Sequence, residues 1–471
     1  MASQPDALSA SSQVTLLGNA LCVDPAAGIN EPTMFHILII GDKISKLFTA
    51  ADTSLETVYA EVTAAEVTAE VTAATATATA TDSIVFHDCE GKLVLPGLFD
   101  MHVHLRDPGQ QYKETIASGS RSAAVGGFTG VLAMPNTDPV IDNASLVAYV
   151  YEQAQATALT RIYCSGALSS GQKGESLAEM AGMQQAGAIA FTDDGKGVQD
   201  SGLMRLALEY ASSIGAPVLS HCQFNDLVGS GQINEGVMST RLGLAGWPAA
   251  GEELQIARDI ALAELTGAAL HIQHVSTARG AELVREAKAR GISVTAEVTP
   301  HHLFLNETAL DERYDTNLKM NPPLRTKADC EALIAALLDG TIDCVATDHA
   351  PHAAHEKQLE FELASFGVTG LETALALMLD QLVATGVISL ATLVERMAHA
   401  PRRILGLAQV NLSSGSQADL TIVDLDKQWV VEADGFESRS NNSAFLGWHL
   451  KGKASDVLVG GRFTLKEGIP V

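Results

Sequence analysis

The sequence predicts an α/β fold, a (β/α)8 TIM-type barrel with a small β-domain formed by the N- and C-terminal segments. Three observations predict it. Between residues 95 and 405, short apolar runs alternate with longer segments of helical spacing. Most of these runs end in histidine, asparagine or aspartate. The two flanks of the chain have the pattern of short strands joined by turns, without helical periodicity.

The apolar runs are the expected barrel strands. Strands that alternate with helices favour parallel pairing, and eight such units favour a closed barrel over an open sheet. Barrels of this kind build their active sites at the carboxyl ends of the strands, so the polar residues there are the candidate functional groups. The runs cover residues 98–105, 128–136, 161–168, 187–194, 216–222, 268–276, 292–302 and 342–350.

The flanks define the expected domain organisation. Residues 1–94 should form the N-terminal part of the small β-domain, residues 95–405 the barrel and residues 406–471 the C-terminal part, because FHILIIGDKISKLF, ADLTIVDLD and VLVGGRFTL read as strands. Residues 51–82 are a low-complexity insertion that repeats AEVT and continues as an Ala-Thr tract, with carboxylates and no lysine or arginine. We expect this segment to be a solvated surface insertion outside the core.

Composition excludes several classes of protein. The chain has 471 residues, 46% of them hydrophobic, and a net charge of −26, so it can bury a large core and would repel nucleic acid and anionic lipid surfaces. The sequence has no apolar run long enough for a membrane span and no signal peptide in MASQPDALSASSQ, which indicates a soluble cytoplasmic protein. The six cysteines are scattered without CxxC pairs, so we expect them to be reduced and buried.

Histidines and aspartates at the strand ends form a candidate metal site. The first barrel strand carries Asp100, His102 and His104 at alternate positions, and period-two geometry places these side chains on one face, where two imidazoles can reach one cation. Four imidazoles and two carboxylates suit zinc, or another borderline divalent metal, in one or two adjacent positions. The candidate ligands are His102, His104, Asp194, His221, His274 and Asp348.

The same alternation separates two histidines of the sixth run. His274 is expected on the strand face of Leu270 and Ile272, whereas His271 points to the other face and is the poorer candidate ligand. Any one strand histidine is more often a core or surface residue than a ligand. The metal-site prediction therefore depends on the six residues taken together.

Several motifs identify a family. PGLFDMHVHLRDPG, MPNTDPV, FTDDG, SHC, HVST, EVTPHHL, KMNPPLR and ATDHAPH together resemble the type I dihydroorotases of the amidohydrolase superfamily. The resemblance extends from about Val14 to Arg462, and the insertion at 51–82 is its main departure. It implies the reversible, zinc-dependent cyclisation of N-carbamoyl-L-aspartate to dihydroorotate, a step of pyrimidine biosynthesis.

The resemblance also implies roles for the candidate ligands. His102, His104 and Asp348 would bind one metal and His221 and His274 a second, with one or two zinc ions left open. Asp194 would bridge or supply a ligand where other members of the superfamily use a carboxylated lysine, and Lys196, two residues later, is a weak candidate for that role. Asp348 is the expected catalytic residue, which moves a proton between the attacking water and the leaving nitrogen.

An anionic substrate in an acidic protein requires a local cation, and Arg106 can bind a carboxylate in bidentate fashion with Asn136 as an added donor. The resemblance implies further substrate contacts from Asn321 and His352, and a backbone contact from Phe366 and Gly367 to the pyrimidine ring. Taken alone, Arg106 fits a surface ion pair equally well, and Asn136 and Asn321 fit a turn and a cap. His301 and His302 are left out of the ligand set. The expected substrate-binding residues are His104, Arg106, Asn136, Asn321, His352, Phe366 and Gly367.

Two alternatives to a dihydroorotase stay open. One is another cyclic amidase, a hydantoinase or allantoinase, which shares the barrel and the paired histidines but typically carries the carboxylated lysine. The other is a non-catalytic dihydroorotase-like subunit of aspartate carbamoyltransferase, which typically loses metal ligands. The sequence is compatible with a homodimer and with a complex with the transferase, and it decides neither.

Overall fold

The computed structural model describes residues 13–63 and 84–471, and its largest feature is a barrel of eight parallel strands. Neighbours in the barrel follow the chain order, and a parallel bridge between Val103 and His349 joins the last strand to the first. The prediction of a (β/α)8 barrel is confirmed. The strands are β6 (Leu98–Val103), β7 (Phe128–Ala133), β8 (Arg161–Gly166), β9 (Ala190–Phe191), β10 (Val218–Ser220), β13 (Leu270–Ile272), β14 (Val294–Val298) and β15 (Cys344–Val345).

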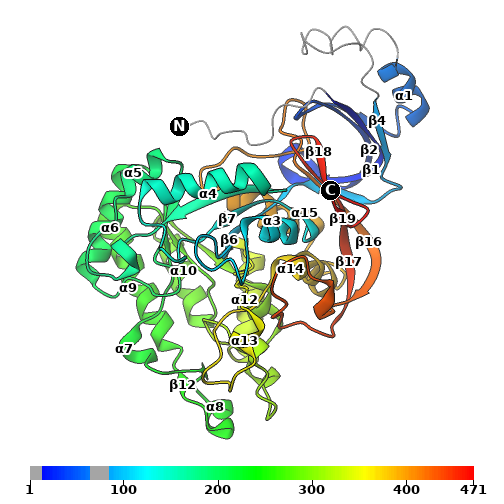
Figure 1. Cartoon of the computed structure of the whole chain (residues 1–471). Helices are drawn as coiled ribbons and strands as arrows, with labels where there is room; N and C mark the ends of the chain where they lie inside the picture. The colour runs from blue at the N-terminus through cyan, green and yellow to red at the C-terminus, as the bar shows by residue number, and fades with distance from the viewer. Residues whose placement is uncertain (1–12, 64–83) are drawn as a thin grey trace.

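Helices follow the barrel strands and surround them, as Figure 1 shows. Several begin at residues whose side chains cap the free backbone N–H groups, including Thr115, Asn143, Asp200 and Thr277. The surrounding helices are α3 (Ile116–Val125), α4 (Ala144–Thr157), α5 (Met180–Gln185), α6 (Ser201–Ser213), α9 (Ala250–Thr266), α10 (Ala278–Ala289), α12 (Lys327–Asp339) and α14 (Leu371–Met378).

Shorter elements occupy the connections. Two strands, β11 (Ile233–Asn234) and β12 (Gly246–Trp247), pair with each other between β10 and α9. The last helices of the barrel region run through residues 390–404 before the chain returns to the small β-domain. The short helices are α7 (Asn225–Val228), α8 (Val237–Leu242), α11 (Pro300–Phe304), α13 (Ala354–Lys357), α15 (Leu390–Val394) and α16 (Ala400–Ile404).

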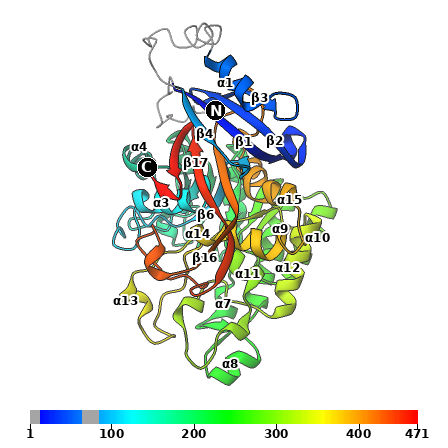
Figure 2. The same ribbon diagram turned by 90° about the vertical axis from the view of Figure 1, so that its right-hand side faces the viewer.

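The two flanks of the chain meet in one nine-stranded sheet, in the order β19-β18-β17-β16-β5-β1-β2-β3 with β4 against β1. The junction is β5, which pairs parallel to β1 and antiparallel to β16. Figure 2 shows this sheet above the barrel, with blue and red strands together. The predicted small β-domain is confirmed. Its strands are β1 (Val14–Asp24), β2 (Ile29–Ile40), β3 (Lys43–Thr49), β4 (Val85–Asp88), β5 (Leu93–Pro96), β16 (Leu420–Val430), β17 (His449–Val459), β18 (Arg462–Lys466) and β19 (Ile469–Pro470).

The chain passes from the sheet into the barrel at Gly97, between β5 and β6. A Cβ atom at this position would overlap the side chain of Thr129, so only glycine allows the close approach. The Arg402 guanidinium donates to the Gly97 carbonyl at 2.7 Å and to Thr129 Oγ1 at 3.1 Å, and it lies over the Phe99 ring. This buried arginine therefore ties the last barrel helix to the start of the first strand.

The beginning of the insertion at 51–82 differs from the expectation. Residues Leu55–Thr63 form helix α1, and its Val58 and Val62 are buried against Leu16, Leu38 and other residues of the sheet. The expectation of a solvated insertion is wrong for this part, because two valines at i and i+4 give the helix one apolar face. The repeats from residue 64 to residue 83 lie outside the described residues.

Two further observations bear on expectations from composition. All six cysteines are buried and unpaired, as expected. In residues 13–63 and 84–471 we find no helix with the length and apolar character that a membrane crossing requires.

The packing of α1 can be tested by truncating its buried face. We expect Val58→Ala to lower the free energy of unfolding by about 2 kcal/mol, because the fully buried side chain loses its packing against the sheet. The matched control is Glu61→Ala on the exposed face of the same helix, which should change it by less than about 0.5 kcal/mol. Urea denaturation followed by circular dichroism measures both. Equal effects of the two substitutions would contradict the packing of α1.

Candidate metal centre

The structure brings all six predicted metal ligands together at the carboxyl end of the barrel strands. His102 lies in β6 and His104 just beyond it, and the other four follow four further strands. Each of the six residues is at most 7% exposed. Closure of the barrel thus converts strand ends far apart in the sequence into one buried cluster. The four residues beyond β6 are Asp194 after β9, His221 after β10, His274 after β13 and Asp348 after β15.

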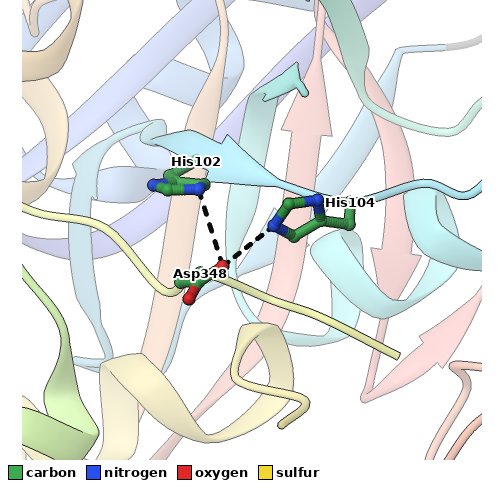
Figure 3. A group of neighbouring side chains, drawn as sticks. All are labelled: His102, His104 and Asp348. Atoms are coloured by element: carbon green, nitrogen blue, oxygen red, sulfur yellow. Dashed lines mark hydrogen bonds and ion pairs between the residues drawn. The ribbon is translucent and has the colours of Figure 1, made fainter. Parts of the chain in front are cut away.

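The first part of the cluster consists of His102, His104 and Asp348. The Nε2 atom of His104 lies 2.9 Å from Asp348 Oδ1, and the Nε2 atom of His102 lies 3.5 Å from the same oxygen. Figure 3 shows both imidazoles directed at this carboxylate, with His102 on β6, His104 just beyond it and Asp348 in the loop that follows β15. Two nitrogens and one oxygen of this kind could hold one divalent cation.

The second part of the cluster is arranged around Asp194. Its Oδ1 atom lies 3.3 Å from His102 Nε2, 3.3 Å from His221 Nδ1 and 3.8 Å from His274 Nε2. Its Oδ2 atom lies 3.4 Å from His104 Nε2. The Asp194 carboxylate therefore lies between the two histidine pairs, where it can bridge two cation positions.

Three observations show that the donor set fits a divalent cation. The buried His102 Nε2 and Asp194 Oδ1 have no hydrogen-bond partner within the described residues. The His221 Nδ1 and His274 Nε2 atoms lie 2.8 Å apart, although each is a potential ligand atom. Burial alone would raise the pKa of Asp194, but the neighbouring charge of His102 and the close imidazoles of His102, His221 and His274 hold that pKa well below its ordinary value. The Asp194 carboxylate is therefore ionised at neutral pH.

Three residues that were not predicted contact the candidate ligands, and a fourth contacts the neighbouring His271. Oε1 of Glu297, on β14, lies 2.6 Å from His102 Nδ1 and accepts the backbone N–H of His274 at 3.2 Å. The pKa of Glu297 is lowered despite burial, because His102 and His271 face the carboxylate. Gln223 Oε1 lies 3.1 Å from His221 Nε2.

One signal could have found Glu297. It is a carboxylate within an otherwise apolar strand run, at a position whose side chain faces the barrel interior. Such a charge is costly to bury unless it is paired. Gln223 reaches His221 only because of the conformation of its loop, which the local sequence does not encode. The remaining two residues of this supporting group are Gln273 beside His102 and Thr295 beside His271.

The strand alternation placed His274 correctly in the cluster but for the wrong reason. Leu270 and Ile272 pack in the core between strands and helices, whereas His271 is directed to Glu297 and Thr295. His274 would follow Leu270 and Ile272 away from the centre if the strand continued. The strand ends at Ile272, and a φ of 34° at His274 turns its side chain into the cluster. The backbone rather than the strand period directs this ligand.

Positive φ values recur at predicted functional residues. Asp348 has a φ of 47° and Arg106 a φ of 58°, in addition to His274. For residues other than glycine this region costs about 1 to 3 kcal/mol each, and it persists only where surrounding contacts impose it. Asp100, which shares the first strand, instead accepts hydrogen bonds from the backbone of His102 and Thr347. Its carboxylate supports the strand and is not directed into the cluster.

Arg106 lies beside the cluster and is 8% exposed. Its Nε atom donates to the Pro351 carbonyl at 3.2 Å, which fixes the guanidinium, while its Nη1 group makes no hydrogen bond within the described part of the chain. His352 Nε2 lies 2.8 Å from the Phe366 carbonyl, so this nitrogen carries a proton. Its buried Nδ1 atom makes no hydrogen bond among the described residues, although Glu356 Oε2 lies 3.6 Å away, and it is the acceptor nitrogen of the ring.

Charge explains the protonation state of His352. Burial lowers its pKa, and the cations of Arg106, Lys113 and Lys357 lower it further. The imidazole is thus neutral at physiological pH, with Nε2 as donor and Nδ1 as acceptor. The same cations give this side of the site a positive potential in a chain of net charge −26.

The two predicted asparagines contact the candidate ligands. Asn136 Oδ1 lies 2.8 Å from His104 Nδ1, and its Nδ2 donates to Asp194 at 3.3 Å. Asn321 Nδ2 donates to Gln223 at 2.8 Å, while its buried Oδ1 has no partner in the described ranges. Asn136 therefore orients two candidate ligands, and Asn321 presents one free acceptor.

Phe366 and Gly367 form a tight loop against His352. The Gly367 N–H donates to the Lys319 carbonyl at 2.9 Å, and a Cβ atom at Gly367, whose φ is 127°, would lie 2.8 Å from Ala350 Cβ. His301 and His302 were left out of the ligand set. His302 Nε2 donates to the Pro322 carbonyl, and His302 Nδ1 lies 2.8 Å from the Thr299 hydroxyl. Burial and the nearby His274 and His102 lower the pKa of His301 to about 4.

Comparison with known proteins decides the family. A family model described as Dihydro-orotase-like matches residues 91–280. A dihydroorotase of Citrifermentans bemidjiense is 52% identical over 375 residues, which cover 80% of this chain and 88% of that protein. A dihydroorotase of Pelotomaculum thermopropionicum is 46% identical over 455 residues, which cover 96% of this chain and 99% of that protein. The chain belongs to the dihydroorotase family.

Solved structures agree on the fold of this dihydroorotase family member. An L-hydantoinase (dihydropyrimidinase) from Arthrobacter aurescens has a TM-score of 0.82 at 25% identity, with 97% of each chain covered. A dihydropyrimidinase from Brevibacillus agri NCHU1002 has a TM-score of 0.79 at 21% identity, with 98% of this chain and 96% of that chain covered. In the barrel of this chain, Lys196 is exposed, whereas the Asp194 carboxylate lies within the cluster of candidate ligands.

The supporting role of Glu297 can be tested by metal affinity. We expect Glu297→Gln to weaken zinc binding by about 10- to 100-fold, because His102 and His274 lose the carboxylate that orients them. Competition with a chromogenic chelator measures the affinity. Glu286→Gln, on an exposed helix face, is the matched control and should bind zinc like the wild type. Unchanged affinity in Glu297→Gln would contradict this role.

Proposed function

We propose that the protein is a dihydroorotase, which reversibly cyclises N-carbamoyl-L-aspartate to (S)-dihydroorotate in pyrimidine biosynthesis. A relative with this name is similar along 96% of the chain. The structural observation that carries the proposal is the buried Arg106 beside the six-residue cluster, since both forms of the substrate are carboxylates. In this proposal the protein is a soluble cytoplasmic enzyme that acts on a small molecule.

The residues of the cluster are the proposed metal site. His102, His104 and Asp348 would hold one zinc ion, and His221 and His274 a second, with Asp194 between them. Bound there, the metal would supply Lewis-acid chemistry, which polarises a carbonyl and acidifies water. One or two ions are compatible with these distances.

Asp348 is the proposed catalytic residue. Burial would raise its pKa, but His102 and His104 hold it below the ordinary value, so the carboxylate is ionised and can accept a proton. In ring opening it takes the proton of the attacking water and delivers it to the ring nitrogen as the C–N bond breaks. In ring closure the same carboxylate takes a proton from the ureido nitrogen as the C–N bond forms, and it gives that proton to the oxygen that leaves the side-chain carboxyl carbon as water.

The proposed substrate contacts surround this carboxylate. Arg106 would bind the substrate carboxylate. Asn136 would hold His104 through its Oδ1 atom and offer its side-chain amide as a hydrogen-bond donor beside it. Asn321 Oδ1 and His352 Nδ1 are two of the buried atoms that make no hydrogen bond among the described residues, and as acceptors they are suited to substrate N–H groups. The Phe366–Gly367 loop would close the ring side of the pocket.

The competing functions are disfavoured by particular residues. A hydantoinase or allantoinase would typically carry a carboxylated lysine, but Asp194 occupies the centre and Lys196 is exposed. A non-catalytic subunit would typically lack ligands, whereas all six converge here. A homodimer and a complex with aspartate carbamoyltransferase stay predictions, and gel filtration of the protein with and without the transferase would test them.

The activity itself is the first test. We expect zinc-loaded protein to open the ring of L-dihydroorotate, followed by ultraviolet absorbance, and dialysis against a chelator to abolish turnover until zinc returns. Asp348→Asn should lower kcat by about 100- to 10,000-fold, because it removes the proton acceptor. Asp434→Asn, at an exposed position, is the control. Zinc-loaded protein that opens hydantoin but not dihydroorotate would refute the proposal.

Recognition of the substrate carboxylate is tested at Arg106. We expect Arg106→Gln to lower kcat/KM for dihydroorotate by about 100-fold, because a carboxylate loses its charged, bidentate partner. Turnover of dihydrouracil, which lacks the carboxylate, should change far less, and the zinc content should stay at the wild-type value. An equal loss of kcat/KM on both substrates would show that Arg106 does not recognise the carboxylate.

A further inference from the structure

The connection between β16 and β17 leaves the small β-domain and reaches the functional end of the barrel. It covers residues 431–448 and lies beside α14 in both Figure 1 and Figure 2, in orange to red. Its backbone N–H groups at Glu437 and Ser438 both donate to Glu372 of α14, at 3.0 Å. These hydrogen bonds fix the connection to the barrel rather than to its own sheet.

The next residues of the connection attach to the loop that follows Arg106. Ser438 donates through its hydroxyl to the buried Glu114, and the Arg439 N–H donates to the same carboxylate at 3.2 Å. Ser440 donates to the Lys113 carbonyl at 2.8 Å. The loop of residues 106–115 is therefore held from the side by the C-terminal part of the chain.

Asn442 makes the largest number of these bonds from a single side chain. Its Oδ1 accepts the His352 N–H at 3.1 Å, and its Nδ2 donates to the Ala350 carbonyl at 3.2 Å and to the Gly367 carbonyl at 3.1 Å. The backbone carbonyl of Asn442 accepts the Thr369 N–H at 3.1 Å. The side chain is 4% exposed, so these bonds are made away from water.

The groups that Asn442 joins belong to two loops that also contact each other directly, since His352 Nε2 lies 2.8 Å from the Phe366 carbonyl and the Ala350 N–H donates to the Val368 carbonyl at 2.8 Å. One follows β15 and carries His352, and the other precedes α14 and carries Gly367. The Gly367 carbonyl receives a second donor from Lys357 at 3.0 Å, and a Cβ atom at Gly367 would lie 3.1 Å from His352 Nε2. The two loops approach so closely that a small shift of either would move the Nδ1 acceptor of His352.

We propose that the β16–β17 connection is a brace for the substrate loops and that Asn442 is a positioning residue for substrate binding. It touches neither the candidate metal ligands nor the proposed reacting atoms. It acts by holding His352 and Gly367 at the separation that the pocket requires. The role in substrate binding rests on the proposed function, which supplies the identity of the substrate. The structural role as a brace rests only on the hydrogen bonds.

The chain provides a matched control in the adjacent Asn441, which is exposed and donates only to the Ala433 carbonyl within the connection. We expect Asn442→Ala to raise KM for dihydroorotate by about 10-fold while kcat changes by less than about 3-fold, because the loss lies in binding. Asn441→Ala should leave both constants unchanged. Asn442→Asp, which keeps the acceptor to His352 and removes the two donated bonds, is the milder variant if the alanine variant folds poorly.

Two further readouts separate positioning from general destabilisation. Zinc content should be equal in all variants, and amide hydrogen exchange should increase in peptides that cover 349–370 and not in the barrel strands. An unchanged KM with unchanged exchange in that segment would overturn the proposal, as would faster exchange throughout the barrel. If the wild type does not open dihydroorotate, the proposed function fails, and hydrogen exchange alone still decides whether Asn442 holds the loops.

Discussion

The buried carboxylate of Asp194 is the group on which the arrangement of the site depends. Four imidazoles lie around it, from strands β6, β10 and β13 and the loops that follow them. An isolated carboxylate at 3% exposure would be too costly to keep ionised, so the surrounding histidines and Asp194 stabilise each other. A second carboxylate, Asp348, enters the same cluster, and two adjacent negative charges would repel each other unless positive charge lies between them. A closed barrel is what makes this geometry available, because it brings the ends of five strands, which carry the six residues, to one rim.

Holding these groups requires more than the barrel strands. The candidate ligands His274 and Asp348 have positive φ values, a conformation that persists only where surrounding contacts impose it. Glu297 supplies such contacts from inside the barrel, since one carboxylate binds the His102 ring and the His274 backbone together. Supporting hydrogen bonds of this kind orient ligand side chains and fix their tautomers. The rigidity of the site thus comes from β14, a strand that contributes no ligand of its own.

The sequence predicted those parts of the structure that repeat or that carry unusual residue types. The eight strands were predictable because apolar runs alternate with helical segments, and the ligands because histidines and aspartates end the runs. His274 shows the limit, because the turn of its backbone, not the strand period, directs its side chain. Val58 and Val62 show another, since a low-complexity composition concealed one apolar helix face. Asn442 could not be predicted at all, because its partners lie 75 to 92 residues away and are mostly backbone groups without a sequence signature.

The acidity of the chain explains why its few buried cations matter. With a net charge of −26, the average field of the surface opposes the approach of an anionic substrate. Arg106, Lys113 and Lys357 oppose that field locally, and together with burial they lower the pKa of His352. Lys113 is itself paired with Glu356 at 2.8 Å, so the net positive potential depends chiefly on Arg106, whose Nη1 is free of partners in the described chain. Because salt screens the surface charges more than buried ones, this local field persists where the global repulsion fades. These buried cations can therefore attract a carboxylate while the net charge of the surface stays negative.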